Sequence, residues 1–134
     1  MSHLVLELRP GETMVVNGAT IRFRSKCRVE LVSQARFVFG KQVMAQDEAE
    51  TALRKLYYDL QMIYAGAPEE QAEARQRLAV LMGDLRSDEQ VEVTVAIGAI
   101  EHCLESGDFY RTLKLLRAMI RNEASRAHAA DGDL

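Results

Sequence analysis

The stretch from Val5 to Gly40 constrains the fold most, because its apolar and charged residues alternate between clear turn signals. Asn17-Gly18 stands between two such runs, and this pair is the strongest short-range hairpin signal because both turn residues tolerate positive φ. Pro10-Gly11 marks a further tight turn, since proline presets φ and glycine accepts the left-handed region. A period of two places the apolar residues of a strand on one face. The stretch therefore predicts a small antiparallel β unit.

The alternation also predicts which residues of these strands face the core. The expected inward-facing residues of the first runs are Leu4, Leu6, Leu8, Ile21, Phe23, Val29 and Leu31. Phe37 and Phe39 alternate in the same way. We expect both to pack in the core, as aromatic residues in strands usually do, although exposed rings could stack on bases.

Charge divides the chain into a basic half and an acidic half. Residues 1–42 hold seven Lys or Arg and three Glu, a net charge of +4. The whole chain carries −3, which leaves −7 for residues 43–134. We expect three regions: a basic β domain over 1–43, an acidic helical domain over 44–124 and a flexible tail over 125–134.

Four helices are expected after the strands. The first opens near Asp47, with Glu50 completing a capping box, and carries an apolar stripe to Tyr64. The second opens at Pro68, which suits the first helical position. A capping box from Ser87 to Gln90 favours a helix next, although valines alternate there as in a strand. Ser106-Gly107-Asp108 then ends that helix and caps the last one.

The last helix carries two different faces. Phe109, Leu113, Leu116 and Ile120 recur at helical spacing and predict its core face. Arg111, Lys114, Arg117 and Arg121 line another face. The predicted fold class is thus α+β, with an N-terminal antiparallel β domain followed by a bundle of about four helices.

The β unit is too short to bury a self-sufficient core. About 40 residues usually need a metal, a disulfide or a partner to fold stably. Neither the two isolated cysteines nor the three scattered histidines form a recognisable staple. We therefore expect the sheet to pack on its own helices or on a second copy, as a homodimer through the N-terminal strands.

Signals of catalysis, metal binding and membrane association are missing from the sequence. The glycines are isolated at turns and build no phosphate loop, and no nucleophile motif or metal-ligand spacing is present. We expect no enzyme activity, no cofactor and no metal. No apolar run approaches the roughly 18–20 residues that span a bilayer, and no signal peptide opens the chain, so we expect a cytoplasmic protein with reduced cysteines.

Two motifs resemble those of the FlbT family of flagellar regulators. The first is Leu-Glu-Leu-Arg-Pro-Gly-Glu-x-x-x-x-Asn-Gly-Ala-x-Ile-Arg, over residues 6–22. The second is Tyr-Tyr-x-Leu-Gln-x-x-Tyr, over residues 57–64. The similarity extends over nearly the whole chain.

The resemblance implies a function in flagellum biogenesis. FlbT proteins associate with the 5′ untranslated region of flagellin mRNA and promote its degradation, acting alongside FlaF. In some lineages they favour flagellin expression instead. The resemblance thus implies an RNA-binding, post-transcriptional repressor of flagellin synthesis.

A second resemblance is local and concerns only the first hairpin. Residues 8–18, Leu-Arg-Pro-Gly-Glu-Thr-Met-Val-Val-Asn-Gly, are similar to the Arg-x-Gly-Glu-x-x-x-Ile pattern of the RNA-binding regulator CsrA, with Val16 in place of isoleucine. That resemblance implies a strand-exchanged dimer that binds RNA through basic edge residues. The four helices expected here depart from that family.

The candidate RNA-binding residues are the seven basic side chains of the β half: Arg9, Arg22, Arg24, Lys26, Arg28, Arg36 and Lys41. Alternate residues of a strand lie about 6.6 Å apart, close to the phosphate repeat of an extended single strand. Two interpretations stay open. The charges contact phosphates of the flagellin mRNA leader, or they solubilise the sheet and pair with the acidic helices.

A protein-binding adaptor or chaperone-like module is the alternative function. Flagellin and FlaF-like proteins are largely helical, and an exposed apolar patch on the helical half could bind them. Tyr57, Tyr58 and Tyr64 are the candidate contacts. Of these, Tyr58 falls off the apolar stripe and is the one we expect at the surface.

Overall fold

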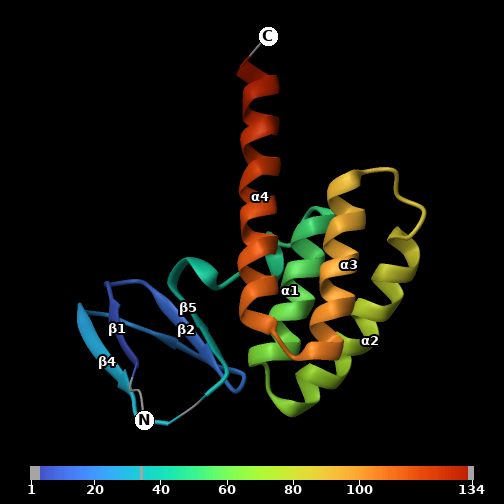
Figure 1. Cartoon of the computed structure of the whole chain (residues 1–134). Coiled ribbons are helices and arrows are strands. Elements are labelled where there is room, and N and C mark those ends of the chain that lie inside the picture. Colours follow the sequence, from blue (N-terminus) through green and yellow to red (C-terminus); the bar gives the residue numbers. More distant parts are fainter. Residues whose placement is uncertain (1–3, 34, 133–134) are drawn as a thin grey trace.

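A computed structural model describes residues 4–33 and 35–132, with side chains to Ala127 in the last helix. Strands come first and helices follow, so the predicted α+β class is confirmed. The strands lie to one side of the helices, and the second half of the last helix extends beyond the others (Figure 1).

Five strands form two small antiparallel sheets. They are β1 (Leu4–Leu8), β2 (Thr13–Val16), β3 (Ala19–Arg22), β4 (Cys27–Leu31) and β5 (Phe37–Phe39). One sheet pairs β1 with β4, and the other has the order β3–β2–β5. Leu6 pairs with Val29 in the first sheet, and Val15 pairs with Thr20 and Val38 in the second.

The hairpin predicted at Asn17-Gly18 is confirmed. Asn17 has φ +51° and Gly18 has φ +82°, and a turn with positive φ at both positions matches the twist of the strands that it joins. β2 and β3 pair directly across this turn.

The turn at Pro10-Gly11 joins the two sheets and does not close a hairpin. Gly11 has φ +88°, yet β1 pairs with β4 and not with the β2 strand that follows it. The Gly11 N–H donates to the Phe23 carbonyl at 2.7 Å, and the Phe23 N–H donates to the Glu12 carbonyl at 2.9 Å. Segments 4–16 and 19–31 therefore form one long ribbon that bends at this point.

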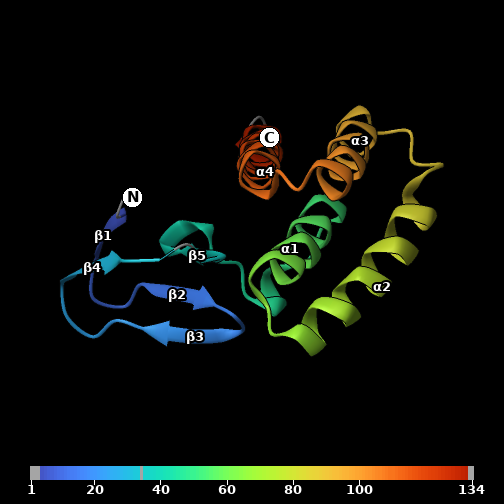
Figure 2. The ribbon, with the colours of Figure 1, turned by 60° about the horizontal axis from the view of Figure 1, so that its bottom comes forward.

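Two short 3₁₀ turns and four α-helices follow the strands. They are η1 (Gly40–Gln42), η2 (Gln46–Glu48), α1 (Ala52–Ala65), α2 (Pro68–Leu85), α3 (Val91–Ser106) and α4 (Phe109–Gly132). Helix α1 is central, because it packs against the other three helices and against β5 (Figure 2). None of the helices in the described residues is long and apolar enough to span a bilayer.

Two of the predicted helix caps are wrong. Helix α1 is capped by Thr51, whose Oγ1 accepts from the Arg54 N–H at 3.2 Å, and Asp47 lies in the preceding 3₁₀ turn. Helix α3 begins after Gln90 without a side-chain cap. Both segments held several residues able to cap, and local spacing does not choose among them because tertiary packing fixes where a helix can start.

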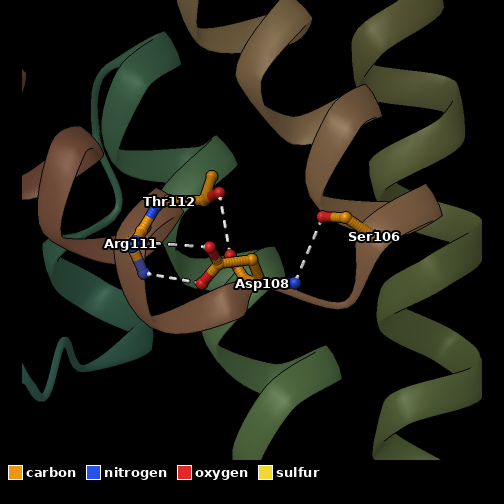
Figure 3. Close-up of polar contacts among 4 residues, drawn as sticks. All are labelled: Ser106, Asp108, Arg111 and Thr112. Atoms are coloured by element: carbon orange, nitrogen blue, oxygen red, sulfur yellow. Dashed lines mark hydrogen bonds and ion pairs between the residues drawn. The ribbon is translucent and has the colours of Figure 1, made fainter.

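The prediction that Ser106-Gly107-Asp108 ends α3 and caps α4 is confirmed. Gly107 ends α3 with φ +81°, which avoids the steric cost of a Cβ in the left-handed region. Asp108 then begins α4: its Oδ1 accepts from the Arg111 N–H at 3.5 Å, its Oδ2 lies 3.5 Å from the Arg111 Nε, and its carbonyl accepts from the Thr112 hydroxyl (Figure 3). The Ser106 hydroxyl accepts from the Asp108 N–H at 3.3 Å. The two helices thus turn sharply within three residues.

The inward-facing residues of β3 and β5 are predicted wrongly, and Leu4 of β1, also expected to face inward, keeps 48% of its surface exposed. All four residues of β3 are exposed, and Ile21 keeps 42% of its surface, because β3 is an edge strand paired only with β2. In β5 the buried residue is Val38, whereas Phe37 and Phe39 lie on the opposite face and are only half-buried. A period of two identifies two faces but does not say which one meets the helices.

The core has two parts. Val15 and Val38 bury their side chains with the apolar stripes of the four helices, so the β3–β2–β5 sheet packs on the chain's own helices as expected. Leu6, Leu8 and Met14 are buried outside that cluster, within the β half. In helix α4 the expected core residues Phe109, Leu113, Leu116 and Ile120 are all buried.

The tail expected over residues 125–134 begins inside a helix. Helix α4 runs to Gly132, and residues 133–134 lie outside the described part of the chain. Good helix formers such as Ala and Arg continue the α4 pattern there. The flexibility of this segment and the independence of the two halves as domains stay predictions.

Candidate functional site

Five of the seven predicted basic residues lie on the paired segments 7–13 and 22–28, where the ribbon bends between its two sheets. We call this group the sheet-junction cluster; its members are Arg9, Arg22, Arg24, Lys26 and Arg28. All five are exposed. Thr13 pairs with Arg22 on one side of the bend, and Leu8 pairs with Cys27 on the other. The two paired backbone segments therefore bring all five residues to the bend of the ribbon.

The basic residues of this cluster do not lie along one continuous strand. Arg22 is the last residue of β3 and Arg28 belongs to β4, whereas Arg24 and Lys26 lie in the bent connection between them. Spacing along a single strand therefore does not set the distances between these charges. The bend instead spreads them around the junction.

Carboxylates offset only part of this charge. Glu7 faces Arg28 across the β1–β4 pair, with 3.8 Å between a carboxylate oxygen and Nε, and both side chains are largely exposed. Such pairs contribute at most about 1 kcal/mol. Glu12 accepts from the Arg9 N–H at 2.7 Å and stabilises the turn. Five cations against these two carboxylates leave a net charge of +3 on segments 7–13 and 22–28.

The other two predicted basic residues lie elsewhere. The Arg36 guanidinium stacks over the rings of Tyr64 and Phe109, at 5.8 and 5.4 Å from their centroids. This cation–π contact attaches the segment before β5 to the helices. Lys41 lies in η1, beside basic residues of α1 and α4. Neither belongs to the sheet-junction cluster.

Both motifs of the sequence build the joint between sheet and helices. The Gly18 N–H donates to the Ala65 carbonyl at the end of α1, at 2.7 Å. Gln61, fully buried, accepts from the Met44 N–H at 2.8 Å and donates to the Met44 carbonyl at 2.9 Å. Tyr57 donates to the Gln42 carbonyl. These side chains thus hold the connection from β5 to α1 in place.

The three candidate tyrosines occupy different environments. Tyr57 keeps 1% of its surface, and burial raises the pKa of its phenol to about 12, with Arg117 opposing the shift. Tyr64 is half-buried and stacks on Phe109 with 5.4 Å between centroids. Tyr58 is half-buried too and lines an open groove of about 610 Å³ between α1 and α2. Tyr58 and Tyr64 reach the surface, and Tyr57 does not.

The α1–α2 groove also contains an ion pair between a buried carboxylate and an arginine that is about half exposed. Asp59 is 6% exposed, and its Oδ1 accepts from the Arg77 Nε at 3.0 Å. Burial raises the pKa of the Asp59 carboxyl, and the hydrogen bond and charge of Arg77 oppose this shift. Val80, with 65% of its surface exposed, and Leu81 give the groove wall an apolar character.

The sequence did not single out a second cationic group, formed by Lys41, Arg54, Arg117 and Arg121 around one cavity. The recurrence of basic residues along one face of the last helix was a signal for two of its members. Their approach to η1 and to the start of α1 depends on tertiary packing.

Together, the fold and these surfaces define a small α+β protein in which a basic β ribbon is fixed on a four-helix half. The chain matches the family described as "Flagellar protein FlbT" over residues 4–126. It belongs to the FlbT family, so the resemblance of its two motifs is confirmed.

Relatives in several bacteria are similar over most of their length. The chain is 31% identical to a protein of Mesorhizobium japonicum over 119 residues, which cover 87% of this chain and 79% of the relative. It is 32% identical to a protein of Brucella ovis over 120 residues, which cover 89% and 78%. Both carry the name "Probable flagellum biosynthesis repressor protein FlbT". No solved structure matches the chain. The strand-exchanged dimer implied by the resemblance of the first hairpin to CsrA therefore stays a prediction.

Proposed function

We propose that this protein is a non-enzymatic, cytoplasmic repressor of flagellum biosynthesis that binds the 5′ untranslated region of flagellin mRNA and promotes its degradation. Its relatives are named as repressors of flagellum biosynthesis, which supports the regulatory part. The observation that carries the RNA-binding part is the sheet-junction cluster, with five exposed cations on two paired segments.

The cluster has the chemistry that a phosphate backbone requires. Most of the affinity of proteins for nucleic acids comes from Lys and Arg side chains that neutralise phosphates and release counterions. Four of the five cations are arginines, which bind a phosphate through two parallel hydrogen bonds. Within the described chain, no carboxylate lies within 4.0 Å of the side-chain nitrogens of Arg22, Arg24 or Lys26. These three remain available for an RNA ligand.

The acidic helical half favours a local RNA site. Residues 43–134 carry a net charge of −7, which repels a polyanion from most of the helical surface. The bound strand would therefore contact the β half and avoid most of the helical surface. Such a division suits a regulator that recognises one leader, and it does not suit a protein that coats RNA.

The test is the affinity for the flagellin leader RNA at several salt concentrations. Each phosphate contact contributes about 0.7 to the slope of log affinity against log salt for a single strand. Arg22→Ala/Arg24→Ala should lower the slope by about 1.4 and weaken binding about 25-fold at 0.1 M salt. Lys55→Ala/Arg75→Ala, which removes two exposed cations from α1 and α2, is the matched control and should change neither quantity by more than a small amount.

Two results would contradict this assignment. Equal slopes for the wild type and the Arg22/Arg24 variant would remove the sheet-junction cluster from the RNA site. Absence of leader binding by the wild type would remove direct RNA binding itself. In cells, deletion of the gene should lengthen the lifetime of flagellin mRNA, and the Arg22/Arg24 variant should fail to restore it.

The groove between α1 and α2 favours a second candidate function, a protein-binding adaptor or chaperone-like module. Tyr58, Val80 and Leu81 offer an apolar wall to a helix of flagellin or of a FlaF-like partner. Binding through this groove would change little with salt, whereas RNA binding would weaken steeply. Val80→Asp should abolish partner binding and leave leader RNA binding intact.

A further inference from the structure

A cavity of about 270 Å³ lies where η1, α1 and α4 meet, and its walls are rich in cations. Lys41 comes from η1, Arg54 from the first turn of α1, and Arg117 and Arg121 from α4. We call this the three-element pocket. It is formed by residues as far apart in sequence as 41 and 121, so only the folded chain assembles it.

The positive charge of this pocket is hardly compensated. Glu48 is the only carboxylate among the lining residues, and its Oε1 already accepts from the Ala45 N–H at 2.8 Å. Arg54 donates to the Glu48 carbonyl at 3.4 Å and not to its carboxylate. In residues 4–33 and 35–132, no ion pair within 4.0 Å involves the four cations. The lining therefore holds four cations against one carboxylate.

Arg117 supplies an independent sign of a missing partner. Its Nε is buried and has no hydrogen-bond partner among the described residues. A buried donor without a partner costs free energy, and proteins rarely leave one without a reason. Arg117 also lies close enough to Tyr57 that its charge lowers the pKa of that buried phenol against the effect of burial. The Arg117 side chain is therefore partly buried at the pocket wall beside Tyr57, with one donor that the described residues leave unpaired.

We propose that the three-element pocket is a binding site for a phosphate group. Arginine donors suit phosphate oxygens, which accept paired and charge-assisted hydrogen bonds. The cavity is smaller than the roughly 300–1,000 Å³ of sites for drug-sized ligands. Its size suits one phosphate with part of an attached sugar. The phosphate could come from an RNA backbone or from a free phosphate compound, and both offer the same oxygens to the pocket.

The site is separate from the sheet-junction cluster and does not depend on the proposed RNA function. None of its four cations belongs to segments 7–13 or 22–28. It can therefore exist whether or not the protein binds a flagellin leader. If RNA supplies the phosphate, the pocket would add a second contact for the strand, at a cationic site of the helical half.

The experiment follows backbone amide NMR signals of the full chain during titration with sodium phosphate, against sodium chloride at equal ionic strength. We expect saturable shifts at Gln42, Val43 and Met44, whose residues line the pocket. Arg117→Gln/Arg121→Gln should weaken phosphate binding at least about tenfold, because it removes two charged donors. Lys41→Gln/Arg121→Gln changes only exposed residues and tests the same loss without touching the partly buried Arg117.

Two controls separate this site from general salt effects and from the RNA site. Lys55→Gln/Arg75→Gln and Arg22→Ala/Arg24→Ala should both retain the wild-type shifts. Shifts that do not saturate, or that persist unchanged in both pocket variants, would overturn the proposal. The source is then decided by competition with a single-stranded RNA hexamer. Displacement of phosphate by the hexamer assigns the site to RNA backbone, and failure to displace it assigns the site to free phosphate compounds.

Discussion

Gly18 should be the glycine whose replacement by alanine harms the fold most, because it combines two constraints. It has φ +82°, and a Cβ built there would lie 2.5 Å from the Ala67 nitrogen and 2.7 Å from the Ala67 Cβ. Gly11 has a similar φ of +88°, but nothing lies within 4 Å of a Cβ at that position. The two glycines therefore form a matched pair that differs mainly in available space.

The expected magnitudes follow from these contacts. A left-handed φ costs a non-glycine residue about 1–2 kcal/mol, and the reduced freedom of the unfolded chain returns part of that cost. Gly11→Ala should therefore lower the free energy of unfolding by about 1 kcal/mol. In Gly18→Ala, the hairpin must also move away from Ala67, which lies in the turn between α1 and α2. That movement breaks the hydrogen bond to the buried Ala65 carbonyl and strains the packing, which adds about 2–4 kcal/mol.

Urea unfolding followed by circular dichroism measures both variants. For a domain of this size the slope is about 2 kcal/mol per M, so the midpoint of Gly18→Ala should fall about 1–2 M below that of Gly11→Ala. Equal midpoints for the two variants would refute the close approach of the hairpin to α1. A milder effect at Gly18 than at Gly11 would refute the reasoning altogether.

The remaining predictions concern Gln61 at the joint between sheet and helices, the Asp59–Arg77 ion pair and self-association of the chain. Gln61→Met keeps the length of the side chain but leaves the Met44 N–H and carbonyl without partners. Urea unfolding should therefore show a loss of about 2–4 kcal/mol in the free energy of unfolding. Gln76→Met, at an exposed position of α2, is the control and should change that free energy little. Burial raises the folded pKa of Asp59, so its contribution to stability is present below the pKa of an unfolded aspartate, about 3.9, and is lost as pH rises through the folded value. Asp59→Asn should therefore gain stability relative to the wild type between about pH 3.9 and neutrality, and a constant difference across that range would argue against a raised pKa. Leu4 and Val5 of β1 and Val32, which directly follows β4, are exposed and favour the self-association expected through the N-terminal strands. Sedimentation should therefore show a dimer that Val5→Lys/Val32→Lys converts to a monomer, and a monomeric wild type at micromolar concentrations would exclude stable dimers.

The sequence by itself determined the features that depend on local chemistry. Asn17-Gly18 closes a hairpin and Gly107 ends α3, because these positions need a positive φ that few residues adopt. Pro68 opens α2, because its φ is preset for a helix and its missing N–H is not needed at the first helical position. The order of strands and helices followed from hydrophobic periods. Two motifs identified the family before any contact was known.

Tertiary structure alone decided which of several locally equivalent choices was used. Thr51 and not Asp47 caps α1, and Val38 and not Phe37 or Phe39 faces the helices. Each alternative satisfies the same local pattern, and only packing against distant elements separates them. The three-element pocket is the extreme case: Lys41 and Arg121 have no relation in sequence, and their charges meet because η1 and α4 pack on the same end of α1.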